Sequence, residues 1–313
     1  MSEDVVAVTF LVLCYNQQAF IDDCVKGALA QDYPVAEFIF SDDASSDGCY
    51  EKLCLAVERY GQGRPVVVRQ NPKNMGLIPH FNLMMSQAKG ELVVLAAGDD
   101  ISFPERVSHL VTRYLSTGKP ALLCSDVAAI DQNGDAAAYE PPGGFMCPAL
   151  NVREAALSKF TYLGATGAVS RSLWENYGDI HYPYAYEDLV LGFRAVLDNS
   201  VEFIDKPLVY YRLGVGISTI DEPRGIHREE LISCRLKEVR LRHDVLAQRL
   251  RDLHRSEQDL PAVVAVLNKR VARLAVRVNF YSARWKLFFD LFRRPAAFWS
   301  GFKREYRYLR DRT

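Results

Sequence analysis

The chain has 313 residues, of which 49% are hydrophobic and 25% charged, and its formal net charge is -1. This balance is typical of a globular protein with an ample core, and it gives no reason to expect a nucleic-acid partner. Seven cysteines without a CxxC pair indicate buried reduced thiols, as in a cytoplasmic protein. No signal peptide is visible and no apolar segment approaches the roughly 20 residues that cross a bilayer, so we expect a chain that is soluble or attached to a membrane surface.

Strand and helix patterns alternate through the first hundred residues. Strands are predicted over 5–14, 37–40, 65–69 and 92–96, and helices over 19–30, 49–60 and 78–88. This alternation favours an α/β fold, with a parallel sheet, helices on both faces and right-handed crossovers. Ligands bind beyond the carboxyl ends of the strands in such sheets. The polar stretches 15–17, 41–43 and 98–100 each follow a strand and should therefore share one rim.

Asp99 and Asp100 follow an almost wholly apolar run that ends at Ala97. Two adjacent carboxylates at the end of a buried strand repel each other and lose hydration, so they need a helix cap, a basic partner or a divalent cation. A helix start is expected over 102–105, and both carboxylates precede it. Oxygen ligands of this kind suit magnesium or manganese, which often bind phosphate oxygens as well. No Walker loop and no GxGxxG is present, so a phosphate-bearing ligand is not expected to be held as in P-loop or Rossmann proteins.

Seven segments occur in the order in which a known family carries them: VLCYNQQAFIDDCVKGALAQDYP at 12–34, FIFSDDASSDG at 38–48, NPKNMGLIPHFN at 71–82, AAGDDISFPERV at 96–107, GATGAVSR at 164–171, YEDLVLGFRA at 186–195 and YYRLGVGIST at 210–219. Residues 8–220 thereby resemble the family 2 glycosyltransferases of the bacterial surface-polysaccharide type, which have the GT-A fold. The resemblance implies a Rossmann-like, mostly parallel sheet in a catalytic domain over 1–220, with a donor half at about 1–107 and an acceptor half at about 108–220. It implies transfer of one sugar from a nucleoside diphosphate sugar, with UDP as the expected nucleotide, to a glycan acceptor that we expect to be lipid-linked.

The resemblance also assigns the part of the donor site that holds the nucleoside. The loop after the first strand, which packs beside the base and ribose in the family, is Cys14, Tyr15 and Asn16. The family's aspartate after the second strand accepts a hydrogen bond from the base, and Asp42 or Asp43 occupies that position.

The diphosphate side of the donor site is implied in the same way. Asp100 would ligate a divalent metal, Mn²⁺ or Mg²⁺, and Asp99 would lie nearer the ribose or a metal-bound water. Asn74 and Gly76 belong to a loop that would close over the nucleotide, although a simple turn is an equal alternative for them.

An inverting transferase needs a carboxylate that takes the proton of the acceptor hydroxyl. The segment at 186–195 resembles the family's ED motif, which makes Asp188 the expected base and Glu187 its partner. The residues alone equally suggest the acidic first turn of a helix, and both roles can hold together. Thr166, Gly167 and Ala168 match the family's stretch beside the acceptor.

Two departures from the family pattern qualify this assignment. Many relatives carry a histidine soon after the Tyr-Arg of the last core strand, whereas here the next histidine is His227. The metal shell would then hold more water, or Ser218 and Thr219 would contact the phosphates. The QxxRW motif is absent, which favours addition of a single sugar over processive synthesis.

The remaining residues, 221–313, are expected to form a helical extension. Helices predicted over 227–255 and 262–283 form a hairpin that packs on the catalytic domain or on another copy of the chain. The tail, residues 284–313, has nine basic and three acidic residues, a net charge of +6, among many Trp, Phe and Leu residues. Such a segment is typical of peripheral attachment to a membrane, here its inner face. The alternative is that the tail packs its aromatic side chains on the body.

Three other functions remain open from the sequence: an inactive nucleotide-sugar-binding regulator, a membrane adaptor and a nucleotidyltransferase. Intact GDD and ED segments disfavour the regulator. The absence of a Gly-rich basic loop at 12–18 disfavours the nucleotidyltransferase.

Overall fold

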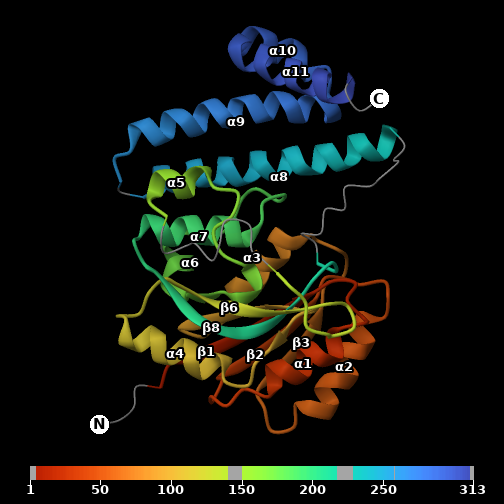
Figure 1. The fold of residues 1–313 in the computed structure, drawn as a ribbon, viewed down its shortest axis with the longest axis vertical. Coiled ribbons are helices and arrows are strands. Elements are labelled where there is room, and N and C mark those ends of the chain that lie inside the picture. Colours follow the sequence, from red (N-terminus) through yellow and green to blue (C-terminus); the bar gives the residue numbers. More distant parts are fainter. Residues whose placement is uncertain (1–4, 140–149, 217–227, 257, 311–313) are drawn as a thin grey trace.

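The computed structural model describes residues 5–139, 150–216, 228–256 and 258–310 (Figure 1). An eight-stranded sheet forms the centre, in the order β3-β2-β1-β4-β7-β6-β8-β5. Its strands are β1 (Val8–Cys14), β2 (Glu37–Asp42), β3 (Val66–Gln70), β4 (Leu92–Ala97), β5 (Ile101–Ser102), β6 (Leu122–Ile130), β7 (Ala168–Ser170) and β8 (Val201–Arg212). The helices between these strands are α1 (Ile21–Leu29), α2 (Cys49–Tyr60), α3 (Leu77–Gln87), α4 (Arg106–Ser116), α5 (Val152–Leu157), the 3-10 helix η2 (Gly164–Thr166), α6 (Arg171–Tyr177) and α7 (Glu187–Leu197).

The sheet is mostly parallel, as the α/β pattern predicted. Strands β1 to β4 run parallel, β6 and β8 run parallel to each other, and β7 is antiparallel to both β4 and β6. Because β7 joins β4 to β6, a single sheet connects the first half of the chain to the second.

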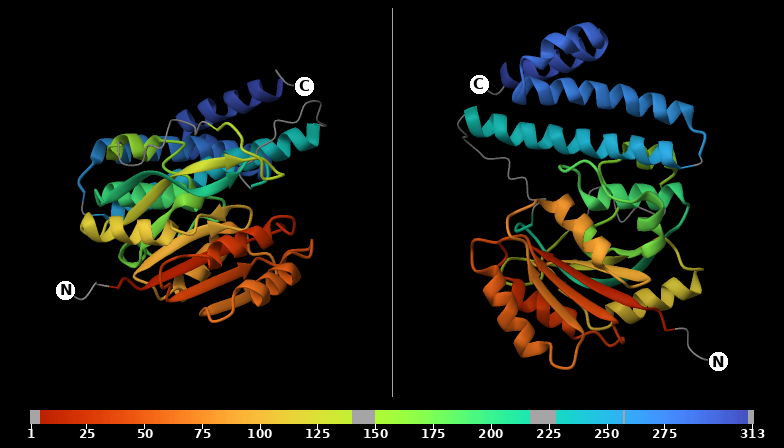
Figure 2. Two further views of the ribbon diagram at one scale, coloured as in Figure 1. Left: turned by 60° about the horizontal axis from the view of Figure 1, so that its bottom comes forward. Right: turned by 180° about the vertical axis from the view of Figure 1, so that it is seen from behind.

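Both faces of the sheet are covered by helices, so its strands are apolar on both sides. Phe10 and Val12 of β1 pack with α1, α2 and α4, whereas Leu11 packs on the opposite face with α3, α6 and α7. Figure 2 shows the sheet between these two helical layers. Because successive side chains of a strand point to opposite faces of the sheet, β1 contributes to two separate hydrophobic cores.

The predicted strands and helices of the first hundred residues are present, with ends shifted by one to three residues. The helix expected to start over 102–105 is present as α4, which begins at Arg106 with Glu105 as its N-cap. Before it, Ile101 and Ser102 form β5, which pairs antiparallel with Val209 and Tyr210 of β8. A two-residue strand has no local signature, because its pairing partner is about a hundred residues away.

The helical extension consists of α8 (Arg228–Arg255), α9 (Pro261–Ser282), α10 (Lys286–Arg293) and α11 (Pro295–Arg310), which confirms the two helices predicted over 227–255 and 262–283. In Figure 1 the helices α7, α8, α9 and α11 lie in successive layers above the sheet. None of the helices within the described ranges has both the length and the apolar character required to cross a bilayer.

A buried carboxylate holds α11 on the hairpin. Glu305 is fully buried and accepts hydrogen bonds from Nε of Arg235 over 2.9 Å and from the hydroxyl of Tyr281 over 2.7 Å, and it also pairs with Arg277. Gly301 lies so close to α9 that a β-carbon there would stand 3.0 Å from the carbonyl oxygen of Arg273. This half of the tail therefore packs on the body.

Candidate active site

The carboxyl ends of β1, β2 and β4 meet at one rim. The N–H of Asp43 donates to the carbonyl of Cys14 over 3.0 Å, and the N–H of Gly98 donates to the carbonyl of Leu13 over 3.1 Å. A β-carbon at Gly98 would stand 2.7 Å from Cβ of Cys14, so only glycine allows the turn after β4 to lie against β1. The polar stretches predicted to share a rim do share it.

The loop after β1 is tied to the loop after β2. Asn16 has a φ of 53°, its N–H donates to Oγ of Ser45 over 2.8 Å, and its Oδ1 accepts from the N–H of Ser46 over 2.9 Å. Tyr15 beside it is 40% exposed at the rim. Asn16 therefore shapes the loop, while the ring of Tyr15 is accessible to a ligand.

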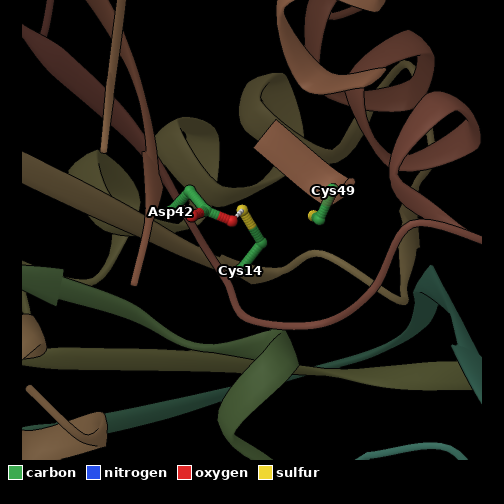
Figure 3. A group of neighbouring side chains, drawn as sticks. All are labelled: Cys14, Asp42 and Cys49. Carbon is green, nitrogen blue, oxygen red and sulfur yellow. Dashed lines mark hydrogen bonds between the residues drawn. The ribbon is translucent and has the colours of Figure 1, made fainter. Parts of the chain in front are cut away.

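Asp42, at the end of β2, is buried and hydrogen-bonded on both carboxylate oxygens. Oδ1 accepts from the N–H of Ser45 over 2.8 Å and from Nε2 of Gln70 over 3.0 Å, and Oδ2 accepts from the Ser45 hydroxyl over 2.5 Å. The Cys14 thiol lies 3.7 Å from Oδ2, as Figure 3 shows. This carboxylate stabilises the loop that follows it.

Cys14, Asp42 and Cys49 present ligand atoms that all lie within 4.8 Å of one another, and all three residues are buried (Figure 3). Two sulfur atoms suit a soft metal, whereas Mn²⁺ and Mg²⁺ prefer oxygen. A hydrogen bond with Cys49, together with burial, raises the pKa of Cys14 well above its usual value, which disfavours the thiolate that a metal binds. The group fits a buried thiol network better than a site for the expected metal.

Asp43 anchors the loop between β3 and α3. Its Oδ1 accepts from Nδ2 of Asn71 over 2.7 Å and from the N–H of Met75 over 2.9 Å, and its Oδ2 accepts from the N–H of Gly76 over 2.9 Å. Gly76 has a φ of 82°, a left-handed conformation that favours glycine, while Asn74 is exposed. The predicted donor-site residues of this loop are thus held against the rim by one carboxylate.

Asp99 and Asp100 are both buried after β4, with an exposed fraction of 5% each. The N–H of Arg212, at the end of β8, donates to Oδ1 of Asp100 over 2.8 Å, and its Nε donates to the carbonyl of Asp99 over 3.0 Å. Burial and the charge of Asp99 nevertheless raise the pKa of Asp100 well above its usual value, and burial also raises the pKa of Asp99. The contacts of Arg212 do not offset this rise, so a further cation would favour the charged form of both carboxylates.

Arg106, at the first position of α4, links the end of β4 to η2. Its guanidinium is fully buried and donates to Oγ of Ser102 over 2.9 Å, to the carbonyl of Leu95 over 2.8 Å and to the carbonyl of Ala165 over 2.8 Å. Its charge opposes the rise in the pKa of Asp100. No local pattern indicates this role, because a lone arginine near a helix start usually faces solvent.

Glu187 and Asp188 open α7, at the position where acidic side chains favour the helix dipole. Oδ1 of Asp188 accepts from the N–H of Leu189 over 2.6 Å. Burial, followed by the charge of Glu187, raises the pKa of Asp188 to about 8, and burial also raises the pKa of Glu187. Asp188 is therefore a much stronger base than an exposed aspartate.

The 3-10 helix η2 lies between the two acidic pairs. The Ala165 carbonyl binds Arg106, and a β-carbon at Gly164 would stand 3.0 Å from Oε1 of Glu187 and 3.4 Å from Cβ of Asp188. The structure thus brings the residues after β4 and the start of α7 to one region through a three-residue segment.

The predicted acceptor residues lie inside the protein. Thr166 and Ala168 are fully buried, and the Thr166 hydroxyl donates to the carbonyl of Leu163 over 2.8 Å. A β-carbon at Gly167 would stand 2.7 Å from the ring of Tyr162. These residues shape η2, and Gly164 and Ala165 are the partly exposed positions of the segment. Ser218 and Thr219, the candidate phosphate contacts, lie outside the described residues.

The model of the family named glycosyl transferase family 2 matches residues 9–168, which is half of the chain. Among curated proteins, a putative glycosyltransferase of Bacillus subtilis, EpsE, is 30% identical over 104 residues, which cover 33% of this chain and 37% of EpsE. The matched stretch covers 39% or less of the length of this and other curated relatives.

Two solved structures share the fold. TarS of Staphylococcus aureus in complex with UDP-GlcNAc has a TM-score of 0.59 at 19% identity, covering 90% of this chain and 75% of that one. The mannosyltransferase PcManGT of Pyrobaculum calidifontis, in complex with GDP-Man and Mn²⁺, has a TM-score of 0.56 at 17% identity, covering 90% and 74%. The architecture expected from the sequence, a GT-A sheet followed by a helical extension, is therefore confirmed. With its family model matched from β1 to the start of β7, this chain belongs to glycosyltransferase family 2.

Proposed function

We propose that this chain is an inverting, metal-dependent glycosyltransferase that moves one sugar from a nucleoside diphosphate sugar to a glycan acceptor. The observation that carries the proposal is the position of η2 against Glu187, with Arg106 linking it to the region of Asp99 and Asp100. In one acidic pair burial raises the pKa of both carboxyls, so that a bound cation would favour their charged form, and the other pair contains a carboxylate with a pKa of about 8. An inverting transfer needs both features, a cation at the leaving group and a base at the acceptor.

The nucleoside is proposed to bind at the rim formed by the loops after β1 and β2. The ring of Tyr15 is accessible there, and Cys14 and Asn16 shape the loop that carries it. Both aspartates are hydrogen-bonded on both oxygens, but Oδ2 of Asp42 lies against the Ser45 hydroxyl and the Cys14 thiol, whereas Oδ2 of Asp43 accepts from the N–H of Gly76. Asp43 is therefore the better candidate to accept from the base. The neighbours TarS and PcManGT bind nucleotide sugars, which supports this class of donor; UDP is our proposal for the nucleotide.

The donor set after β4 fits a hard divalent cation. Two buried carboxylates with raised pKa values offer oxygen ligands, and Arg212 contacts the pair through its backbone N–H and through Nε, which donates to a backbone carbonyl. Asp100 would hold Mn²⁺ or Mg²⁺, with Asp99 beside it. Such an ion, when bound, stabilises the negative charge of the diphosphate leaving group.

Asp188 is proposed to act as the base, with Glu187 as its partner. The carboxylate takes the proton of the acceptor hydroxyl as that oxygen bonds to the anomeric carbon, and the bond to the diphosphate breaks on the opposite face. Attack on the face opposite the leaving diphosphate inverts the anomeric configuration. The negative charge of Glu187 raises the proton affinity of Asp188, which suits this task near neutral pH.

We further propose that the acceptor is a lipid-linked glycan of surface-polysaccharide synthesis and that α10 binds the inner membrane surface. A packed amphipathic helix buries its apolar side chains and exposes its polar ones. Helix α10 does the opposite, because it buries the polar Asp290 and exposes its aromatic rings. Oδ2 of Asp290 accepts from Nδ2 of Asn279 over 2.8 Å, so a polar contact holds α10 to α9. The exposed fractions are 67% for Trp285, 64% for Phe288 and 70% for Phe292.

Charge complementarity favours an anionic bilayer as the partner of this face. The tail, residues 284–313, carries a net charge of +6 while the rest of the chain carries -7. Rings of Trp and Phe suit the headgroup layer, and each basic residue near an anionic surface contributes about 1 kcal/mol. The alternative that the tail packs its rings on the body holds for Phe298 of α11, which is 9% exposed, and does not hold for α10.

The test is transfer from a panel of nucleoside diphosphate sugars, with Mn²⁺ present, to membrane lipid extract. NMR of the product should show an anomeric configuration opposite to that of the donor. Donor binding without transfer or hydrolysis would indicate the inactive regulator, and release of pyrophosphate from a sugar phosphate and a nucleoside triphosphate would indicate a nucleotidyltransferase.

A further inference from the structure

The first turn of α7, which carries Glu187 and Asp188, is held from outside by side chains of other elements. The hydroxyl of Thr161 donates to the carbonyl of Asp188 over 2.8 Å. Thr161 fits there because residue 192 is glycine; a β-carbon at Gly192 would stand 2.6 Å from Oγ1 of Thr161. The peptide that bears the proposed base is thus fixed on one side by the segment that leads into η2.

On its other side the turn is held by Arg249, which belongs to α8 of the helical extension. Nε and Nη2 of Arg249 donate to the carbonyl of Leu189 over 3.1 and 2.8 Å. Nη1 donates to the carbonyls of Ser158 over 2.8 Å and Ala156 over 3.4 Å, at the end of α5. The side chain is fully buried. One guanidinium therefore joins α8, α5 and the residue that follows Asp188.

A buried cation at this place also affects the charge of the carboxylate. The charged and titratable groups that act on Asp188 are Glu187 on its own helix, Tyr186 just before it and Arg249 from α8. Glu187 raises the pKa of Asp188, whereas Arg249 lowers it. The two neighbours thus oppose each other, and the structure places the positive one in a different part of the chain.

We infer that Arg249 is the positioning residue of Asp188: its fork of hydrogen bonds orients the first turn of α7, and its buried positive charge acts on the carboxylate of the base. The inference rests on the proposed role of Asp188 and extends it to the helical extension, which then completes the acceptor half of the active site. Arg249 does not itself contact substrate in this role.

A second buried contact between α7 and α8 offers a matched control. Arg194 of α7 pairs with Asp252 of α8, with Nε to Oδ2 at 2.9 Å and Nη2 to Oδ1 at 3.2 Å. Asp252 is also buried, and Nε2 of Gln248 donates to its Oδ1 over 2.8 Å. Asp252→Asn weakens the same helix pair without removing the cation next to Asp188.

The experiment measures kcat/KM against pH for the full chain and for Arg249→Gln, Arg249→Lys and Asp252→Asn. Loss of the cation in Arg249→Gln should move the midpoint of the acid limb upward by about one pH unit, since an opposite charge nearby lowers a carboxyl pKa by that order. Arg249→Lys keeps the charge and should keep the midpoint. Its plateau should fall about tenfold, because one ammonium group cannot replace the fork and the base is misplaced. Asp252→Asn should lower thermal stability and leave the midpoint unchanged.

A midpoint in Arg249→Gln equal to that of Asp252→Asn would overturn the inference. If Arg249→Gln does not fold, Arg249→Lys decides: a wild-type plateau rejects a positioning role, and a reduced plateau with a wild-type midpoint and donor KM supports it. ¹³C NMR of labelled aspartate carboxyls, with Asp188 assigned by its loss in Asp188→Asn, gives the same midpoint without turnover. Full activity of Asp188→Asn would instead refute the proposed function, which separates the two failures.

Discussion

Gly164 lies directly against Glu187: a β-carbon at residue 164 would stand 3.0 Å from Oε1 of that carboxylate. A contact this short forces the Glu187 side chain to move by a few tenths of an ångström and narrows the space in front of α7. Gly164→Ala is therefore expected to lower kcat/KM for the acceptor about tenfold, since small misplacements at a reacting centre are costly. The dissociation constant of the donor, measured by calorimetry, should stay unchanged. A parallel loss of donor binding would show that the substitution in η2 also disturbs the donor site.

The acidic pair at the start of α7 leads us to expect a loss of turnover on substitution and a defined pH dependence of kcat/KM. Asp188→Asn should reduce kcat by about 10²–10⁴-fold with donor binding nearly unchanged, the usual effect of removing a general base. Because the base acts deprotonated and its pKa is about 8, kcat/KM of the wild type should rise as pH increases and level off above that value.

Glu187→Gln removes the neighbouring negative charge and should move this midpoint to lower pH. An inactive Glu187→Gln beside an Asp188→Asn with normal turnover would reverse the assignment within the pair. If both variants turn over normally, neither residue is the base.

Asp100 is predicted to control metal-dependent binding of the nucleotide. Asp100→Ala should abolish transfer and lower the affinity for Mn²⁺ in the presence of UDP, measured by the EPR signal of free Mn²⁺. Asp135→Asn serves as control, since Asp135 is exposed in the turn after β6. Full wild-type activity in excess chelator would contradict the metal requirement.

The exposed rings of α10 predict salt-sensitive membrane binding. The double substitution Phe288→Ser and Phe292→Ser should abolish flotation with vesicles that contain anionic lipid, and wild-type flotation should weaken as salt increases. Both side chains are at least 64% exposed, so stability should change little. Leu55→Ser on α2, where Leu55 is 63% exposed, is the matched control and should float as the wild type does.

Equal flotation of the double variant and the wild type would exclude α10 as the anchor. A wild type that sediments as a dimer and ignores vesicles would assign the face to a second copy of the chain. Deletion of 284–313 is a poorer test, because it also removes Glu305 and leaves Arg235 and Arg277 of the hairpin without that partner.

Glu305 is predicted to be a strong determinant of stability. Glu305→Gln should lower the free energy of unfolding by about 3–5 kcal/mol, because the buried guanidinium of Arg277 then lacks its counter-charge and that of Arg235 keeps only Glu238. Burial alone would raise the pKa of Glu305, but hydrogen bonds from Arg235 and Tyr281 and the charge of Arg277 bring it below the usual value.

A lowered carboxyl pKa gives stability that is present above the unfolded-state pKa, near 4.5, and is lost as pH falls through the lower folded-state value. The difference in unfolding free energy between wild type and Glu305→Gln should therefore shrink in acid. Thermal unfolding at several pH values measures it, and a difference that stays constant would contradict the buried ion pair.

The amino-acid sequence by itself determined the alternation of strands and helices, the helical extension and the meeting of three polar stretches at one rim. These properties follow from local patterns, because hydrophobic periodicity selects the element and parallel order brings strand ends together. The pairs Asp99 with Asp100 and Glu187 with Asp188 were also visible, since each is contiguous in the chain. Their roles in binding and catalysis remain predictions.

Only the tertiary structure decided which residues surround those pairs. Arg106 reaches Ala165 across 59 positions, and Arg249 reaches Leu189 across 60, so no local pattern predicts either contact. The sequence likewise predicted an apolar face on α10 but not its direction. That direction depends on Asp290, whose carboxylate binds Asn279 of α9 and thereby turns the rings toward solvent. Buried charges select their partners by three-dimensional proximity, because an unpaired charge inside the protein is too costly to leave, and proximity of this kind is absent from a linear pattern.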